Sequence, residues 1–404
     1  MELSVEKKPI SEGLLIAMLA AVNFTHIMDF VIMAPLNPFL KESMSITTEE
    51  FGFLVSIYTF AAAAGAIIAF FKIDSYDRRT ALTILYTGFI VANVFCAIAP
   101  GYKFFLMARL FAGLFGGVLN VLIMSVVGDA IPMARRGKAM GMIMAAFSAA
   151  SVLGIPCGLI LADIYDDYHP PFILLSGLSL IVGIFLFIKF PSITGHIEAK
   201  ETKTPHIDVL KGFIKDSNVT LALLFMFLLM IAGFTVVPFI SDYLVHNVGL
   251  DKEDLKYVYL CGGLATAVSS PIVGRLADKF GKVKVFVIAA LLSIVPIVIV
   301  TVLPVWPLPY VLMFNVIFFM CFGGRFVPAM TLISSCVKPQ RRGSFLSINS
   351  AVQQLASGVA VMIASTIIIN DASGKLFNFG WVGILAAAAT LICIGVAVRL
   401  KEVS

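Results

Sequence analysis

The chain has 404 residues, of which 60% are hydrophobic and only 13% are charged, and its formal net charge is +5. A soluble domain of this size needs more polar surface, so the composition excludes an ordinary globular protein. The positive charge lies between apolar runs and forms no basic surface interleaved with aromatic side chains. Nucleic acid is therefore not expected as a partner.

Apolar runs recur along the whole chain, each of the ~20 residues that cross a bilayer at ~1.5 Å per residue. They lack the two-residue alternation of membrane barrel strands, so we interpret them as helices. The sequence thus predicts an all-α polytopic membrane protein embedded in a lipid bilayer. Its twelve predicted spans are residues 12–39, 50–71, 80–100, 103–130, 138–163, 171–190, 218–241, 254–274, 283–303, 308–334, 343–369 and 377–398.

The placement of lysine and arginine supports this number of spans. With twelve spans, 22 of the 29 basic residues lie on the side that both termini share, five lie on the other side, and Arg109 and Arg325 fall inside spans. Cytoplasmic loops carry the excess of basic residues in membrane proteins. We therefore expect both termini to be cytoplasmic, and the first helix to be retained rather than cleaved as a signal peptide.

Two cytoplasmic loops of the first half recur in the second half at a nearly constant offset. Asp74 in KIDSYDRRTAL corresponds to Asp278 in GRLADKFGKVK, 204 residues later. Arg135 in PMARRGKAMG corresponds to Arg341 in KPQRRGSFLS, 206 residues later. This agreement indicates an internal duplication, and parallel six-helix repeats are typical of transporters whose binding site lies between the halves.

The duplication divides the chain into three parts. We expect an N-terminal six-helix bundle over residues 1–190, a cytoplasmic linker over 191–217 and a C-terminal six-helix bundle over 218–404. The end of the linker, IDVLKGFIKDS, has apolar residues at helical spacing. It is either a helix on the membrane surface or an ordinary linker.

The loop after the eighth span carries a family signature. Residues 274–282, GRLADKFGK, match the motif G-x-L-A-D-(R/K)-x-G-(R/K) of the major facilitator superfamily. Arg109-x3-Gly113-x3-Gly117 resembles the fourth-helix motif of that superfamily. The chain therefore resembles the superfamily over essentially its whole length, and the resemblance implies two pseudo-symmetric six-helix bundles.

Two further features resemble a subgroup of efflux proteins. Gly154, Pro156 and Gly158 in GIPCG fit the core of an antiporter motif on the fifth helix, although Ile155 separates the glycine from the proline. Asp29, followed by Pro35, sits where drug/proton antiporters carry an acid on the first helix. The chain looks nearest to drug/proton antiporters and to the arabinose-efflux-permease-like group.

This resemblance implies a secondary active transporter that exports a small organic solute, such as a drug, sugar or metabolite, in exchange for protons by alternating access. The alternative is a proton symporter or uniporter of a small organic anion on the same fold. The resemblance also implies a functional monomer in the bacterial inner membrane. Without a GxxxxGK(S/T) loop or an HExxH or GxSxG motif, we expect neither ATP hydrolysis, an enzyme activity nor a cofactor.

A carboxylate in an apolar span usually faces the bundle interior and pairs with another group. Asp29 and Arg109 fall at similar depths from the outer surface by helical rise, so the superfamily's arrangement lets them face each other. His26 is three residues before Asp29 and shares its face. We predict that the three residues form a proton-coupling cluster. The alternatives are a purely structural pair, and for His26 a hydrogen bond to a helix carbonyl; no third ligand indicates a metal site.

Arg325 is the second basic residue inside a span, and no acid lies in a span of its half. It contacts either substrate or cavity, or it donates hydrogen bonds to helix carbonyls. The duplication places Arg325 beside the counterpart of Asn120, and it aligns Arg109 with Asn315. Asn349 and Gln353 share a helix face at i, i+4. We expect these polar residues to line the cavity, or to hold helices together.

The repeated loops are candidates for a conformational latch on the cytoplasmic side. The superfamily resemblance suggests that Asp74 and Asp278 contact helix starts of the opposite half and release them when that side opens. The alternative is that these loops only orient the topology. The first copy has Phe70 and Asp77 where the motif has glycines. The predicted latch residues are Asp74, Arg78, Arg79, Gly274, Asp278, Gly281 and Lys282.

Overall fold

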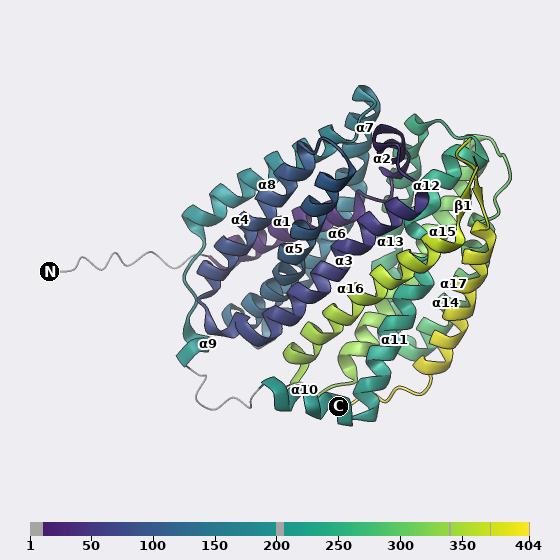
Figure 1. Ribbon diagram of the computed structural model, residues 1–404. Helices are drawn as coiled ribbons and strands as arrows, with labels where there is room; N and C mark the ends of the chain where they lie inside the picture. The colour runs from purple at the N-terminus through teal and green to yellow at the C-terminus, as the bar shows by residue number, and fades with distance from the viewer. Residues whose placement is uncertain (1–10, 199–205, 339–340, 372, 404) are drawn as a thin grey trace.

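The computed structural model describes residues 11–198, 206–338, 341–371 and 373–403. Within these residues, twelve helical segments are long and apolar enough to cross a bilayer, which confirms the predicted all-helical, twelve-span fold. Two bundles lie side by side, with α9 (Gly195–Glu198) and α10 (His206–Lys215) between them in sequence (Figure 1). We call the end that holds α9 and α10 cytoplasmic, because the excess of basic residues lies there.

The first bundle contains α1 (Glu12–Val31), α2 (Asn37–Met44), α3 (Thr48–Lys72), η1 (Ile73–Ser75), α4 (Arg78–Ala97), α5 (Tyr102–Ala130), α6 (Met133–Ala149), η2 (Ala150–Gly154), α7 (Ile155–Tyr165) and α8 (His169–Lys189). The second contains α11 (Ser217–Phe234), η4 (Val237–Phe239), α12 (Ile240–Tyr243), η5 (Leu244–Val248), η6 (Lys252–Asp254), α13 (Leu255–Phe280), α14 (Lys282–Val300), α15 (Leu308–Ser335), α16 (Arg342–Ile367), β1 (Ile369–Asn370), β2 (Leu376–Phe377) and α17 (Phe379–Ala397). The two short strands form an antiparallel hairpin.

The first span ends earlier than predicted. Instead of running to residue 39, α1 ends at Val31, and a turn leads into the separate short helix α2. Pro35 explains the break, because proline lacks an amide donor and disfavours helical backbone in the residue before it. Pro38 then occupies the first turn of α2, where no donor is needed. The predicted span boundary at residue 39 was therefore wrong.

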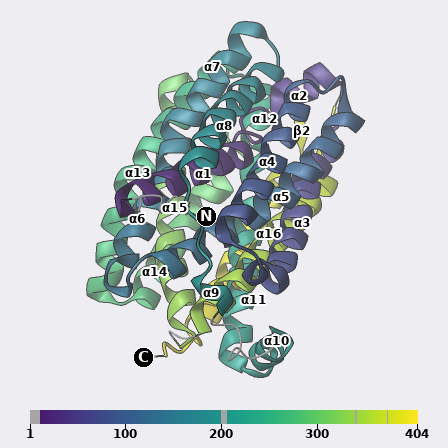
Figure 2. The ribbon, with the colours of Figure 1, turned by 90° about the vertical axis from the view of Figure 1, so that its left-hand side faces the viewer.

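The outer end of the molecule carries α2, α12 and the hairpin, opposite α9 and α10 in both views (Figure 2). Here the two bundles share one apolar core, in which Phe39 and Phe51 of the first bundle join Phe239 and Val258 of the second. Phe51 and Phe239 make an edge-to-face contact, with centroids 6.1 Å apart. Burial of shared apolar surface therefore holds the bundles together at this end.

Towards the cytoplasm the apolar core divides in two. One cluster, from Leu15 to Phe190, belongs to the first bundle and takes only Ala351 from the second. The other, from Phe213 to Leu400, lies in the second bundle apart from Phe213, which α10 contributes. The two bundles are thus joined at their outer ends and packed separately at their cytoplasmic ends, an arrangement closed towards the outside.

Small residues allow α3 of the first bundle to pack closely along α16 of the second. A Cβ on Gly358 would lie 2.5 Å from the Thr59 hydroxyl, and one on Gly52 would lie 2.3 Å from Ser365. Ser56 donates a hydrogen bond of 3.0 Å to the Gly358 carbonyl across this contact. The helix α3 therefore lies at the boundary between the bundles, where it packs against α16 on one side and α5 on the other.

Candidate functional site

Asp29 and Arg109 lie together in the interior of the first bundle. Arg109 Nη1 donates to Asp29 Oδ1 at 2.5 Å, and the two side chains are 1% and 0% exposed. A buried carboxylate favours its neutral form, whereas a neighbouring guanidinium favours its charged form. The structure therefore brings together an acidic and a basic residue that both lie within apolar spans. We call Asp29 and Arg109 the buried pair.

Close packing of α3 on α5 sets the surroundings of the buried pair. A Cβ on Gly113 would lie 2.1 Å from the carbonyl oxygen of Tyr58, and one on Gly117 would lie 2.1 Å from that of Ala62. Only glycine allows backbones this close, so the two glycines of α5, four residues apart, press α3 against it. As a result Tyr58 lies beside Arg109.

Tyr58 is the residue of this site that the sequence reasoning missed. Its ring lies beneath the Arg109 guanidinium, whose central carbon is 4.2 Å from the ring centroid. It also stacks on Phe30, at 5.8 Å between centroids, and Phe30 reaches Phe234 of the second bundle at 5.6 Å. The one signal in the sequence was a polar aromatic residue among the small residues of IYTFAAAAGA. The buried pair is thus two aromatic contacts away from the opposite bundle.

His26 is not part of the buried pair in this structure. Its ring is 7% exposed, and among the described residues neither of its nitrogens has a hydrogen-bond partner. A Cβ on Gly116 would lie 3.1 Å from His26 Nε2 and 3.0 Å from the Tyr58 hydroxyl, so these groups flank one point. Within the same residues, Asp29 Oδ2 and the Tyr58 hydroxyl make no hydrogen bond of ordinary geometry, although the two groups are close enough to interact. Polar atoms of His26, Asp29 and Tyr58 thus gather around the buried pair.

Arg325 donates hydrogen bonds within its own bundle, including one to a helix carbonyl. It is 1% exposed and donates to the Ala232 carbonyl at 2.9 Å and to the Thr390 hydroxyl at 3.0 Å. Its guanidinium carbon lies 5.0 Å from the Phe322 ring centroid. All these partners belong to the second bundle, so in this conformation Arg325 ties together α11, α15 and α17.

The four predicted cavity amides do not meet at one place. Asn120 donates across the bundles to the Ser350 hydroxyl at 3.4 Å, whereas Asn315 donates to the Val311 carbonyl of its own helix at 2.9 Å. Asn349 is 1% exposed, and within the described residues its side-chain oxygen has no partner. Gln353 is half-buried on α16, one turn further along. In the described part of the chain, Asn120 is the one amide of the four with a hydrogen bond where the bundles meet, on the cytoplasmic side of the buried pair.

In the first copy of the repeated loop, Arg78 forms its ion pairs within its own bundle. Arg78 is 2% exposed and contacts Asp74 and Asp129, each at 2.7 Å. Arg79 donates to the Phe187 carbonyl at 2.9 Å. Asp77, which replaces a motif glycine, caps the start of α4 and accepts the Ile193 amide at 2.8 Å. Arg78 thus ties this loop to α5, and Asp77 ties it to the segment after α8.

The second copy keeps the backbone that its motif requires. Gly281 has φ 92°, a left-handed conformation that favours glycine, where the chain turns from α13 into α14. Lys282 pairs with Glu402 at 2.6 Å, and a Cβ on Gly274 would meet Val327 only at an ordinary contact distance. Asp278 is exposed and makes no ion pair within the part of the chain that the structure describes. The predicted contacts between Asp278 and the first bundle are thus not formed in this conformation.

The glycines and proline of the fifth span lie at a break in that helix. A π-helical turn, η2, ends at Gly154, and Pro156 follows in the first turn of α7. A Cβ on Gly154 would lie 3.1 Å from Met28, and one on Gly158 would lie 2.6 Å from Ile32, so this helix packs tightly on α1 beside Asp29. Missing side chains and a missing amide therefore shape the wall next to the buried pair.

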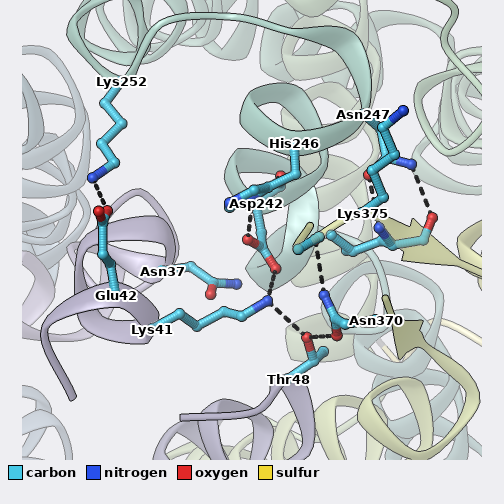
Figure 3. A network of polar contacts seen from close by, with 12 residues as sticks. Asn37, Lys41, Glu42, Thr48, Asp242, His246, Asn247, Lys252, Asn370 and Lys375 are labelled. Carbon is cyan, nitrogen blue, oxygen red and sulfur yellow. Dashed lines mark hydrogen bonds and ion pairs between the residues drawn. The ribbon is translucent and has the colours of Figure 1, made fainter. Parts of the chain in front are cut away.

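A second polar group, the outer network, joins the bundles at their outer ends (Figure 3). Lys41 of α2 pairs with Asp242 of α12 at 2.7 Å, and Asp242 is fully buried. Lys41 also donates to the Thr48 hydroxyl at 3.0 Å, and Thr48 donates in turn to Asn370 of the hairpin. His246 Nδ1 lies 2.9 Å from Asp242 Oδ1. No local pattern in the sequence indicates this group, because its members lie on short elements far apart in the chain.

Further ion pairs surround the outer network. Lys252 contacts Glu42 and, at 3.4 Å, Asp166, while Lys256 lies 3.3 Å from Asp163. Asn247 exchanges two hydrogen bonds with the backbone of Leu376, which fixes the hairpin to η5. The outer ends of the bundles are therefore joined by charges as well as by apolar burial.

Two six-helix bundles with a charged pair in the interior and contacts that close one end are the architecture of a secondary transporter. A family model described as "Major Facilitator Superfamily" matches residues 19–239 and 222–403, and the chain belongs to this superfamily. It is accordingly a multi-pass membrane transporter and not an enzyme.

Relatives and solved structures agree with this assignment. The chain is 26% identical to "Uncharacterized MFS-type transporter YceJ" of Bacillus subtilis, over 85% of this chain and 86% of that protein. It is 22% identical to a "Probable sugar efflux transporter" of Helicobacter acinonychis, over 63% of each. The crystal structure of a D-xylose-proton symporter superimposes with a TM-score of 0.76 at 17% identity, covering 95% of this chain and 97% of the other, and shows the shared fold.

Proposed function

We propose that this transporter exports a small organic solute, such as a drug, sugar or metabolite, in exchange for protons, and that Asp29 carries the proton. The observation that carries the proposal is the buried pair, 2.5 Å between Asp29 Oδ1 and Arg109 Nη1 at the centre of an apolar bundle. A permanent charge pair at such depth has little reason to persist as a stabiliser, because well-packed apolar residues serve as well. A pair that opens when Asp29 accepts a proton can couple proton movement to transport.

The mechanism follows from charge. When Asp29 is ionised, its carboxylate on α1 balances the positive charge of Arg109 and holds that side chain. When Asp29 accepts a proton, Arg109 loses its counter-ion. The freed guanidinium keeps its contact with the Tyr58 ring. A solute that donates hydrogen bonds from hydroxyl or amine groups binds the ionised carboxylate of Asp29 in place of the proton, so its arrival favours release of the proton. Proton and solute thus exclude each other, as antiport requires. An anionic solute would instead bind the freed Arg109 together with the proton, which is the symport alternative.

Two features favour export over uptake. The glycine and proline residues of η2 and α7 fit an antiporter motif and pack directly against α1 at Met28. A relative that covers 63% of the chain is a probable sugar efflux transporter. The fold itself does not set the direction, since it also matches a D-xylose-proton symporter. Symport or uniport of a small organic anion is therefore the competing proposal.

We further propose that the protein works as a monomer in a bacterial inner membrane. Its bacterial relatives and the strong bias of basic residues to one side support this location. The buried pair, the outer network and the π-helical break all lie within one chain, so one copy contains every group that the mechanism uses.

The test begins with a solute identified by ligand-induced thermal shift across a compound panel at two pH values. Purified protein in proteoliposomes is then given a proton gradient with no solute gradient. Antiport moves the solute against the direction of proton flow, symport moves it along that direction, and uniport gives no net movement. Solute flowing with the protons would overturn export by exchange.

Asp29→Asn separates coupling from binding in the same vesicles. We expect proton-driven transport to fall at least tenfold, while exchange of labelled for unlabelled solute continues, because the bundles can still rock without the proton. Asp208→Asn, on the exposed face of α10, removes a carboxylate outside the mechanism and should behave as wild type. Proton-driven transport by Asp29→Asn at the wild-type rate would end the proposal.

A further inference from the structure

The outer network holds one buried carboxylate between two basic groups from different parts of the molecule (Figure 3). Lys41, which is 11% exposed, reaches Asp242 from the first bundle. His246, which is 28% exposed, approaches the same carboxylate from one turn along its own helical segment. Lys41 therefore has to leave when the outer ends separate, whereas His246 stays with Asp242 in every conformation.

We infer that His246 and Asp242 form a second proton-binding site, facing the outside, whose occupancy releases the ion pair between Lys41 and Asp242 and so opens the outer end. An imidazole titrates near neutral pH, where external acidity varies. While His246 is neutral, Lys41 is the only cation that balances Asp242 within the outer network. Once protonated, His246 takes over that role and also repels Lys41.

Linkage gives the same result from the open side. Separating the bundles removes Lys41 and leaves Asp242 without its cross-bundle partner, which is costly for a carboxylate that is fully buried when closed. A proton on His246 offsets that loss. His246 therefore binds a proton more tightly in the open state, and by reciprocity the bound proton favours opening.

Few other charges face His246. From its own helical segment comes Asp242, and from α2 comes Lys41. From the hairpin, Gly374 packs against the ring, and the nearby Lys375 and Asp371 are exposed. A hydrogen bond from Ser373 lowers the pKa of Asp371, so that carboxylate stays charged while His246 titrates. The loop 301–307, whose Leu303 accepts the Tyr243 hydroxyl, has no charged side chain.

The experiment measures the outer separation of the bundles as pH changes. Spin labels are placed at Lys103→Cys, at the outer start of α5, and at Val305→Cys, in the outer loop before α15; both positions are exposed. The three native cysteines that are not buried, Cys157, Cys261 and Cys321, are replaced by serine. Electron–electron distances are then recorded in lipid nanodiscs, without added solute, at about pH 8 and about pH 5.5, on either side of the imidazole range.

We expect the ratio of long to short distances to rise roughly fivefold or more at the lower pH, the usual size of coupling between two sites. His246→Gln should abolish this rise. Lys41→Met should give long distances at both pH values, because the cross-bundle pair is gone. His169→Gln is the matched control: His169 contacts Asp167 at 2.8 Å on the outer side, but both belong to one bundle, so the rise should persist.

The same measurement in Asp29→Asn separates this proposal from the proposed coupling role of the buried pair. If the outer site acts on its own, the pH response survives in Asp29→Asn and disappears in His246→Gln. A response that is lost in Asp29→Asn but kept in His246→Gln would overturn the outer site and leave Asp29 as the sensor. Equal responses in wild type and His246→Gln would overturn it as well.

Discussion

Removing one member of the buried pair should cost far more stability than removing both. Asp29→Leu leaves Arg109 charged and unpaired in a site where it is 1% exposed. Breaking a buried ion pair in this way typically costs about 3–5 kcal/mol. Arg109 keeps its contact with the Tyr58 ring at 4.2 Å, worth about 0.5–2 kcal/mol, which limits the loss. We therefore expect Asp29→Leu to lower the free energy of unfolding by about 2–4 kcal/mol.

The double variant Asp29→Leu with Arg109→Met removes both charges and keeps apolar volume. Its free energy of unfolding should return to within about 1 kcal/mol of wild type, since apolar replacement of a buried pair is often neutral or stabilising. Reversible unfolding in mixed micelles, followed by far-UV circular dichroism, measures each value, and a double-mutant cycle gives the coupling energy. A double variant less stable than Asp29→Leu alone would refute the reasoning.

An exposed pair supplies the control for this cycle. Lys282 and Glu402 lie 2.6 Å apart, but their side chains are 26% and 45% exposed. Pairs of this kind contribute about 0–1 kcal/mol, so Lys282→Met and Glu402→Gln should change stability little, alone or together. The contrast between the two cycles isolates the effect of burial from that of the ion pair itself.

Two further outcomes follow from the packing around Tyr58. Tyr58→Phe keeps the ring under Arg109 and should leave unfolding in micelles nearly unchanged, whereas Tyr58→Leu should lose at least the ~0.5–2 kcal/mol of the cation–π contact; equal losses would show that the hydroxyl matters instead. Gly117→Ala places a methyl group 2.1 Å from a backbone oxygen of α3 and should destabilise by ~1–3 kcal/mol in the same assay. Gly128→Ala, on the same helix with open space around it, should gain ~0.5–1 kcal/mol, and a loss there as large as at Gly117 would contradict the packing argument.

The sequence predicted the membrane architecture because the bilayer imposes it. A span must be apolar, about 20 residues long and flanked by basic loops on one side, and each of these is a local property. The meeting of Asp29 and Arg109 could be anticipated for a related reason: charged groups isolated in apolar spans have few partners available. The end of α1 was missed because Pro35 lies in an apolar run that looks continuous by hydropathy.

The rest depended on contacts that no local pattern encodes. Tyr58 joins the site because glycines of α5 draw α3 towards it, which is a property of two helices together. Arg325 found its acceptors on helices 65 and 93 residues away in sequence. The outer network exists only while the bundles are closed at that end, so its residues come together in one conformation rather than in the fold as such.

The division of the apolar core has a consequence for how the transporter can be biased. Switching conformations has to dissolve the shared core at the outer end, where Phe51 meets Phe239, and build an equivalent one between the two cytoplasmic clusters. The equilibrium between the outward-closed and outward-open states therefore depends on which end buries more apolar surface, independently of any bound ion. The first cytoplasmic cluster already contacts the second bundle at Ala351. Larger apolar side chains near Ala351 would bury more surface at the cytoplasmic end and so shift this equilibrium towards the outward-open state.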